Sequence, residues 1–281
     1  MQTIIGLGSA GCKIADCFKT FPQYNVLNID TGLKKSKTAY NLKYQDHPEK
    51  YEASFKVPKG LLDDIQSECL FITSCGHVSS TSLKILQEVS KKSKVQVMYL
   101  VPDKNNLTKT KKLHNNLLFN VFQEYARSGV FESVFLVDNK KISDIIGPVP
   151  ILKYWDSVNQ LICATYNMIN IFEHTEPVFT TFSGKNEAAR IKTLGISSLE
   201  QVEKKSFFSL DLIKEEWYYY AIPQKMLEED VSLMQKIQTQ ITNAKTHDAM
   251  KVGYSVYTTE YDVPYVYCLN STTLVQTLPA S

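Results

Sequence analysis

The first half of the chain alternates short apolar runs with polar or amphipathic segments, and this alternation limits the folds it can adopt. The apolar runs read TIIGL, YNVLNID, CLFITSCG, VQVMYLVP and FESVFLVDN, and most segments between them have helical periodicity. The polar stretch 34–59 is expected to be irregular, and LLDDIQSE to form a short helix. Apolar strands separated by helices are typical of a parallel sheet covered on both faces. We therefore expect an α/β domain with its ligand site beyond the carboxyl ends of the strands.

The first of these strands runs directly into a glycine-rich turn, IIGLGSAGCKIAD. Gly6, Gly8 and Gly11 match the spacing G-x-G-x-x-G, and Asp30 ends the second strand, where dinucleotide-binding folds place an acid that reads the ribose. Such a turn lets the backbone approach a phosphate, which the N–H groups and positive dipole of the next helix would bind. The same glycines would also serve plain packing of the helix on its strand.

The hydrophobic pattern of the sequence changes at Pro150, where the second half begins. The run ILKYWDSVNQLICATYNMINIFEH is one apolar helical segment of about six turns, which predicts a central helix rather than a surface one. Beyond it come the strand-like runs EEWYYYAIP, MKVGYSVYTTEY and VPYVYCLNST and the helical run EEDVSLMQKIQTQITNAK. Closely spaced strands predict a mixed or antiparallel sheet. We expect a nucleotide-binding domain over 1–149, a core helix over 150–174 and a smaller α+β domain over 175–281.

Composition excludes several classes of protein. The net charge of +2 provides no strong field for nucleic acid. No run approaches the length of about eighteen apolar residues that a membrane span needs, and the N-terminus does not resemble a secretory signal. The six cysteines contain no C-x-x-C pair, which argues against zinc and against a disulfide framework. We expect reduced thiols in a cytoplasm, no nucleic-acid partner and no membrane insertion.

The order of the segments resembles that of the FtsZ and tubulin family. IIGLGSAGCKIAD resembles the family's opening, where a glycine-rich turn ends in Gly-Cys, and VLNIDTGLKK resembles its second strand. CLFITSCGHVSSTSLKILQEVSKKSKVQVMYLVP is similar to the strand, phosphate loop, helix and strand that carry the tubulin signature. The resemblance implies a Rossmann-like nucleotide-binding domain with a parallel sheet, a long central helix and a smaller α+β C-terminal domain. It points to the bacterial or phage type, similar to TubZ-like proteins.

In that family GTP lies between loops at the strand ends, and subunits stack head to tail. The resemblance therefore implies GTP or GDP as ligand, Mg2+ as a further candidate cofactor, and self-association into filaments. The first turn would wrap the phosphates, the second strand would end near the ribose and the magnesium, the serine-rich segment would form a second phosphate loop, and the core helix would accept from the guanine edge. The residues are Gly6, Gly8, Ser9, Ala10, Gly11 and Cys12 in the first turn; Asn28 and Asp30 at the end of the second strand; Ser74, Gly76, Ser79, Ser80 and Thr81 in the serine-rich segment; and Asp156 in the core helix.

The chain departs from the family pattern at three places. The loop G-G-G-T-G-[ST]-G is replaced by SCGHVSSTS, in which only Gly76 remains. Lys13 stands where FtsZ has an asparagine that helps to read the base, and an ammonium group offers no acceptor. The segment 177–194 contains no aspartate, whereas FtsZ uses N-x-D-x-x-D there to activate water. Because a positioned carboxylate often contributes ~10²–10⁴ in rate, we expect slow hydrolysis or none.

Three functions remain open at this point. The first is a GTP-binding filament protein with weak or absent hydrolysis. The second is a relative that keeps the fold as a structural or assembly module and binds nucleotide poorly. The third is a nicotinamide-dependent oxidoreductase, which depends on the first turn alone, since none of the five histidines is paired with a carboxylate in a catalytic pattern.

Overall fold

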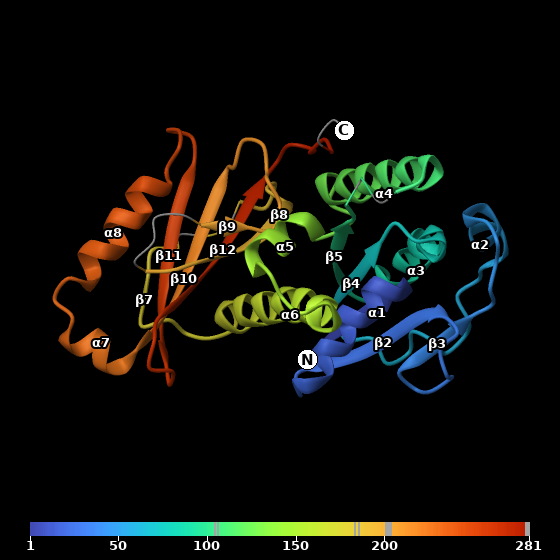
Figure 1. The fold of residues 1–281 in the computed structure, drawn as a ribbon, viewed down its shortest axis with the longest axis horizontal. Coiled ribbons are helices and arrows are strands. Elements are labelled where there is room, and N and C mark those ends of the chain that lie inside the picture. The colour runs from blue at the N-terminus through green and yellow to red at the C-terminus, as the bar shows by residue number, and fades with distance from the viewer. Residues whose placement is uncertain (104, 106, 183, 185, 200–203, 279–281) are drawn as a thin grey trace. The chain divides into compact units, whose positions relative to one another are not determined.

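The computed structural model describes residues 1–103, 105, 107–182, 184, 186–199 and 204–278. The chain forms two compact units (Figure 1), one made of Met1–Cys163 together with the chain from Val275 onward, the other of Ala164–Leu274. The division falls inside helix α6 (Tyr154–Glu173), which contributes to both units. Within the described residues, none of the helices combines the length and apolar composition needed to cross a bilayer.

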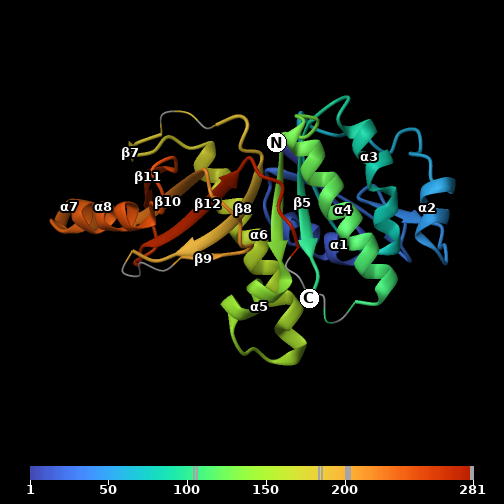
Figure 2. The same ribbon diagram turned by 90° about the horizontal axis from the view of Figure 1, so that it is seen from above.

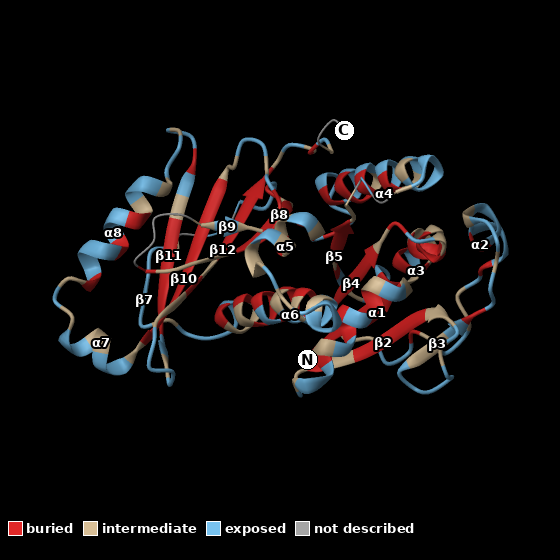
Figure 3. Cartoon of the chain, viewed as in Figure 1, coloured by how far each residue is buried: buried red, intermediate tan, exposed pale blue. Residues whose placement is uncertain are grey.

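The sheet of the first unit is wholly parallel, in the order β3-β2-β1-β4-β5-β6. The apolar runs in the sequence form its central strands, such as β2 and β4, which are mostly buried (Figure 3), and β1 is buried at every residue. The strands are β1 (Gln2–Leu7), β2 (Tyr24–Thr31), β3 (Ala39–Leu42), β4 (Glu68–Ser74), β5 (Lys94–Val101) and β6 (Ser133–Asp138).

Helices cover both faces of this sheet, as expected for parallel strands. The register aligns Gly6 with Ile72 and Ile72 with Met98, so Tyr99 points to the face opposite the one at Gly6. Helix α1 packs on the face of Gly6, and α4 lies along β5 on the opposite face (Figure 2). On that face the ring centroids of Phe122 and Tyr99 lie 5.5 Å apart. The helical segments are α1 (Gly8–Cys17), η1 (Phe18–Thr20), α2 (Pro48–Ser54), η2 (His77–Thr81), α3 (Ser82–Val89), α4 (Lys109–Arg127), α5 (Asn139–Ile146) and η4 (Ile151–Lys153).

Two expectations for the region before β4 are wrong. The stretch 34–59 is not irregular throughout, because it contains β3, which pairs with β2, and α2, whose Tyr51 is buried. The segment LLDDIQSE forms turns rather than a helix, beginning with a hydrogen bond from Leu61 N to Pro58 O at 3.2 Å. The first difference comes from contacts outside the stretch, with β2 and with the segment after β4, which local periodicity does not report. In the second, Gln66 N donates to Thr3 Oγ1 of β1 at 2.9 Å, a contact that the periodicity of LLDDIQSE does not report either.

The sheet of the second unit is mixed, as predicted, in the order β8-β12-β10-β11-β7 with β9 on β8. Strands β10 and β11 are parallel, whereas β12 runs antiparallel to both β10 and β8. The predicted single helix after β10 is two helices, because Asp230 accepts from Ser232 N at 2.8 Å and turns the chain between them. The elements are β7 (Phe179–Thr180), β8 (Ile191–Ser197), β9 (Lys205–Ser206), β10 (Glu215–Pro223), α7 (Gln224–Glu229), α8 (Leu233–Ala244), β11 (Lys251–Thr259) and β12 (Tyr265–Thr272).

Candidate anion-binding site

The first helix starts at the carboxyl end of β1 with its amide groups open. Leu7 has an extended backbone, and among the described residues no side chain makes a capping hydrogen bond at this helix start. Gly8 has a φ of +73°, and no described atom lies within 4 Å of where its Cβ would be. Glycine is therefore required here by backbone conformation rather than by space. The first N–H groups of a helix have no intrahelical acceptor, so this end is suited to an anion.

The other two glycines of the turn are explained by packing. A Cβ on Gly6 would lie 2.7 Å from the Gly11 carbonyl oxygen and 2.8 Å from the Ala15 Cβ. A Cβ on Gly11 would overlap the carbonyl oxygen of Ile72 in β4. The two glycines thus let α1 lie close against β1 and β4, which is the structural role that the sequence left open beside phosphate binding.

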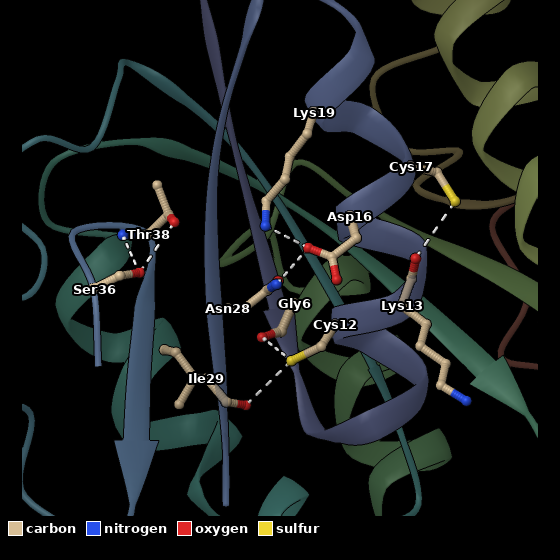
Figure 4. Close-up of polar contacts among 10 residues, drawn as sticks. All are labelled: Gly6, Cys12, Lys13, Asp16, Cys17, Lys19, Asn28, Ile29, Ser36 and Thr38. Carbon is tan, nitrogen blue, oxygen red and sulfur yellow. Dashed lines mark hydrogen bonds and ion pairs between the residues drawn. The ribbon is translucent and has the colours of Figure 1, made fainter. Parts of the chain in front are cut away.

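The remaining residues of this turn offer a ligand mainly their backbone. The Cys12 thiol donates to the carbonyl oxygens of Gly6 at 3.3 Å and Ile29 at 3.7 Å (Figure 4). Burial raises the pKa of this thiol to about 12, so it is protonated at neutral pH. Ser9 is exposed and Ala10 is half-buried. A phosphate at this turn would therefore be held by amide groups.

The end of β2 carries the two residues proposed to lie near a ribose. Asn28 donates from Nδ2 to Asp16 Oδ1 at 2.7 Å, and Asp16 also accepts from Lys19 at 2.6 Å (Figure 4). The Oδ1 of Asn28 is buried and has no hydrogen-bond partner among the described residues. Asp30 accepts from Thr31 N at 2.8 Å, and burial raises the pKa of its carboxyl. Asp16, which orients Asn28, was not identified from the sequence, because nothing local marks a helix carboxylate that bonds to a neighbouring strand.

In the serine-rich segment after β4 the hydroxyl groups turn back on the chain. Ser80 donates to Pro48 O at 2.7 Å and to His77 O at 2.8 Å, and Thr81 donates to Val78 O at 2.8 Å. Ser74 likewise donates to Leu100 O at 2.7 Å, and Ser79 to Gly76 O. Gly76 has a negative φ of −87°. The hydroxyl protons are thus donated to carbonyl oxygens of the chain itself. Neither backbone conformation nor the space around it requires a glycine at position 76.

Helix α2 packs against this serine-rich segment, which sequence reasoning missed. Besides the Ser80 bond to Pro48 O, the Lys84 ammonium donates to Phe55 O at 3.1 Å. His114 of α4 also lies close, since its pKa is lowered first by burial and then by the charge of His77. The sequence feature that could have indicated α2 is Pro48 at its first position, because proline is common where helices begin.

Asp156, proposed to accept from a guanine, lies exposed in the first turn of α6. Its charge acts on Cys17 of α1: a hydrogen bond with Cys163 lowers the pKa of the Cys17 thiol, and burial, Asp16 and Asp156 oppose that change. Trp155 is 53% exposed and Leu152 is 92% exposed, so apolar surface flanks this carboxylate. Lys13 is exposed on α1 (Figure 4).

The chemistry available is that of binding more than of catalysis. Among the described residues, no three His, Cys, Asp or Glu side chains come together as a metal site. In the segment 177–194, where Ser183 and Lys185 lie outside the described residues, the acid is Glu187, which is exposed. A carboxylate held in place to orient water is not found in the described part of that segment.

Comparison with known proteins finds similarity in structure and not in sequence. No protein-family model and no curated protein matches the chain. A GTPγS-form protofilament of TubZ from Bacillus thuringiensis serovar israelensis matches with a TM-score of 0.71 and 13% identity, covering 96% of this chain and 88% of that one. GTPγS-bound CetZ2 from Haloferax volcanii gives 0.72 and 13%, covering 96% and 92%. An empty FtsZ dimer from M. jannaschii gives 0.65 and 10%, covering 96% and 87%.

Proposed function

We propose that this chain, which has the FtsZ/tubulin fold, is a filament protein that binds guanine nucleotide and hydrolyses it slowly or not at all. The fold likeness extends over nearly the whole chain and includes TubZ and CetZ2 protofilaments. That likeness supports the proposal without deciding nucleotide binding, because folds are shared by proteins of different function.

The start of α1 is the observation that carries nucleotide binding. The positive φ of Gly8, the absence of a capping side chain among the described residues and the close packing allowed by Gly6 and Gly11 leave a row of amide groups at the carboxyl edge of a parallel sheet. This is where such sheets bind ligands, and helix starts favour phosphates. A bound nucleotide would supply the anionic charge that these amides are oriented to neutralise.

The other candidate residues fit a nucleotide in different degrees. The unpartnered Oδ1 of Asn28 is a buried acceptor that a ribose hydroxyl would satisfy, and the exposed carboxylate of Asp156 is suited to accept from guanine N–H groups. The segment from Ser74 to Thr81 would border the phosphates with its backbone, since its hydroxyl protons are already donated to carbonyl oxygens.

Nucleotide binding and assembly can be tested separately. Titration calorimetry with GTP, GDP, ATP and NADH should show binding of the guanine nucleotides only. Analysis of the nucleotide released from freshly purified, denatured protein should give the same preference. Sedimentation and light scattering with GTP and GTPγS should then show polymer with both, and little phosphate release with GTP. Preferential binding of NADH would contradict the proposal.

A structural module without nucleotide is the second candidate, and the serine-rich segment favours it. The family's glycine-rich phosphate loop is replaced there by a segment whose hydroxyls satisfy its own carbonyls. This candidate predicts assembly that is unaffected by nucleotide, and no binding in calorimetry.

The strand order of the first sheet does not distinguish the oxidoreductase interpretation from the two candidate functions above. The order β3-β2-β1-β4-β5-β6 is also that of dinucleotide-binding domains. The likeness that extends through α6 and the second unit favours the filament fold instead.

A further inference from the structure

A groove follows the free edge of the first sheet, on the side away from the candidate anion site. It has a volume of about 1230 Å³ and is lined mainly by residues 24–27 of β2, the segment 35–40, and residues 58–61 and 63–66. These β2 residues form the amino-terminal half of the strand, whereas Asp30 lies at its carboxyl end. The groove and the anion site therefore lie at opposite ends of β2.

Strand β2 is paired along only part of this edge. The pairing with β3 starts at Asn28, whose N–H donates to Thr38 O at 2.9 Å. Alternate residues of a strand direct their backbone groups to the same edge, so the N–H and C=O of Val26 face the same way as those of Asn28. At Tyr24 the N–H already donates to Phe21 O at 3.3 Å. Val26 thus presents a donor and an acceptor to the groove beyond the end of the β3 ladder.

Both walls of the groove are held by their own hydrogen bonds. On one side Thr38 N donates to Ser36 Oγ at 3.2 Å (Figure 4), and Ser36 N donates to Ala39 O at 3.2 Å. On the other side Gln66 N donates to Thr3 Oγ1 at 2.9 Å. Walls that are ordered before binding lower the entropy cost of holding a ligand.

The charge of the groove is mainly positive. Lys35, Lys37 and Lys59 are exposed, and none of them forms an ion pair with a described residue. The other charged side chains of the lining are Lys19, which pairs with Asp16 at 2.6 Å, Asp63, which pairs with Lys92 at 3.4 Å, and Asp64. Among the described residues, three lining ammonium groups and one lining carboxylate, that of Asp64, therefore have no ion-pair partner.

We propose that this groove binds an extended acidic peptide segment, which adds a short strand to β2 at Val26 and places its carboxylates against the lysines. Strand addition at an open edge takes affinity from main-chain hydrogen bonds and selectivity from side chains. The open backbone favours a peptide over a nucleic acid, because a phosphodiester chain cannot continue a sheet ladder. Residues 24–27 span about 13 Å, which fits a segment of four or five residues.

The test uses the full chain and a fluorescein-labelled peptide of four Val-Glu repeats, followed by anisotropy at low salt. The peptide should bind, and a peptide of four Val-Lys repeats should not. The triple variant K35E/K37E/K59E should weaken binding at least about tenfold. The matched control K91E/K225E/K245E makes the same change in net charge on exposed lysines elsewhere, and it should stay within about twofold.

A second probe separates strand addition from plain charge attraction. The Val-Glu peptide with N-methyl groups on alternate amides keeps its charge but loses the donors of one edge, and it should bind at least about tenfold more weakly. Equal binding of the two peptides would overturn the proposal, as would tighter binding of an oligothymidylate of the same charge. Absence of peptide binding would also overturn it, and would indicate that the lysines only protect the edge from other strands.

Discussion

The turn after β1 and the turn after β4 lie side by side at the carboxyl edge of one sheet, yet they are built in opposite ways. In the first turn, glycines bring α1 close to β1 and β4 and leave the amides at the helix start open. In the second, hydroxyl groups bond to carbonyl oxygens, and the one glycine is required by neither space nor a positive φ. We therefore expect anion binding at this edge to depend on which turn leaves donors unused, and the two turns can be tested against each other.

The largest effect is expected from a methyl group at Gly11. In Gly11→Ala the new Cβ would overlap the Ile72 carbonyl oxygen, which is backbone and cannot move alone, so we expect a loss of about 3 kcal/mol in the free energy of unfolding. Gly76→Ala is the control, since no described atom lies within 4 Å of its Cβ, and a change below about 0.5 kcal/mol is expected. Urea denaturation measures both, and equal losses would remove the contrast between the turns.

A smaller effect is expected at Gly8, where conformation rather than space is at stake. Gly8→Ala should cost about 1–2 kcal/mol because of its positive φ, and should also weaken GTP binding by moving the first amides of α1. Gly147→Ala has nearly the same φ, +71°, and equally open surroundings, but lies at the end of α5.

The pair is compared by thermal unfolding and by GTP calorimetry. We expect similar losses of stability and a loss of affinity in Gly8→Ala alone. If both variants bind GTP like the unmodified chain, the start of α1 does not hold the phosphates.

Removing a hydroxyl from the second turn should have a still smaller effect. Ser80→Ala loses the bonds to Pro48 O and His77 O, which we expect to cost about 1 kcal/mol of stability. GTP affinity should stay within about twofold, because this hydroxyl proton is not available to a ligand. A tenfold loss of affinity in calorimetry would identify the segment as a phosphate loop and contradict the proposed difference between the two turns.

The smallest perturbation is chemical labelling of thiols along α1. Burial raises the pKa of Cys12 to about 12, so this thiol stays protonated at pH 8, whereas the hydrogen bond from Cys163 lowers the pKa of Cys17. We expect iodoacetamide to modify Cys17 well before Cys12, with the Cys17 rate increasing as pH rises toward its pKa. Peptide mass mapping over time measures both rates. Faster labelling of Cys12 would mean that α1 does not pack on β1 as described.

The strands show where sequence reasoning succeeds. Runs such as CLFITSCG and EEWYYYAIP are predicted as strands because each contains a short, mainly apolar core of strand-forming residues, which is a local signal. Strand β3, with the sequence AYNL, and β8, with IKTLGIS, were missed because each depends on pairing with another strand, β2 and β12 respectively, rather than on an apolar run of its own. Helix α2 was missed for the same reason, since its support comes from the segment after β4.

The same distinction between local sequence signals and contacts made in the fold applies to the candidate site. An α/β sheet that ends in a glycine turn can be predicted from the amino-acid order, because apolar periodicity and glycine spacing are properties of neighbouring residues. The folded chain was needed to show that Gly11 is a packing residue, that Asp16 orients Asn28 and that the serine hydroxyls donate to carbonyl oxygens of the chain itself. This difference arises because a hydrogen-bond donor is satisfied or left open according to which acceptor the fold brings within about 3 Å of it, and a linear sequence does not contain that distance.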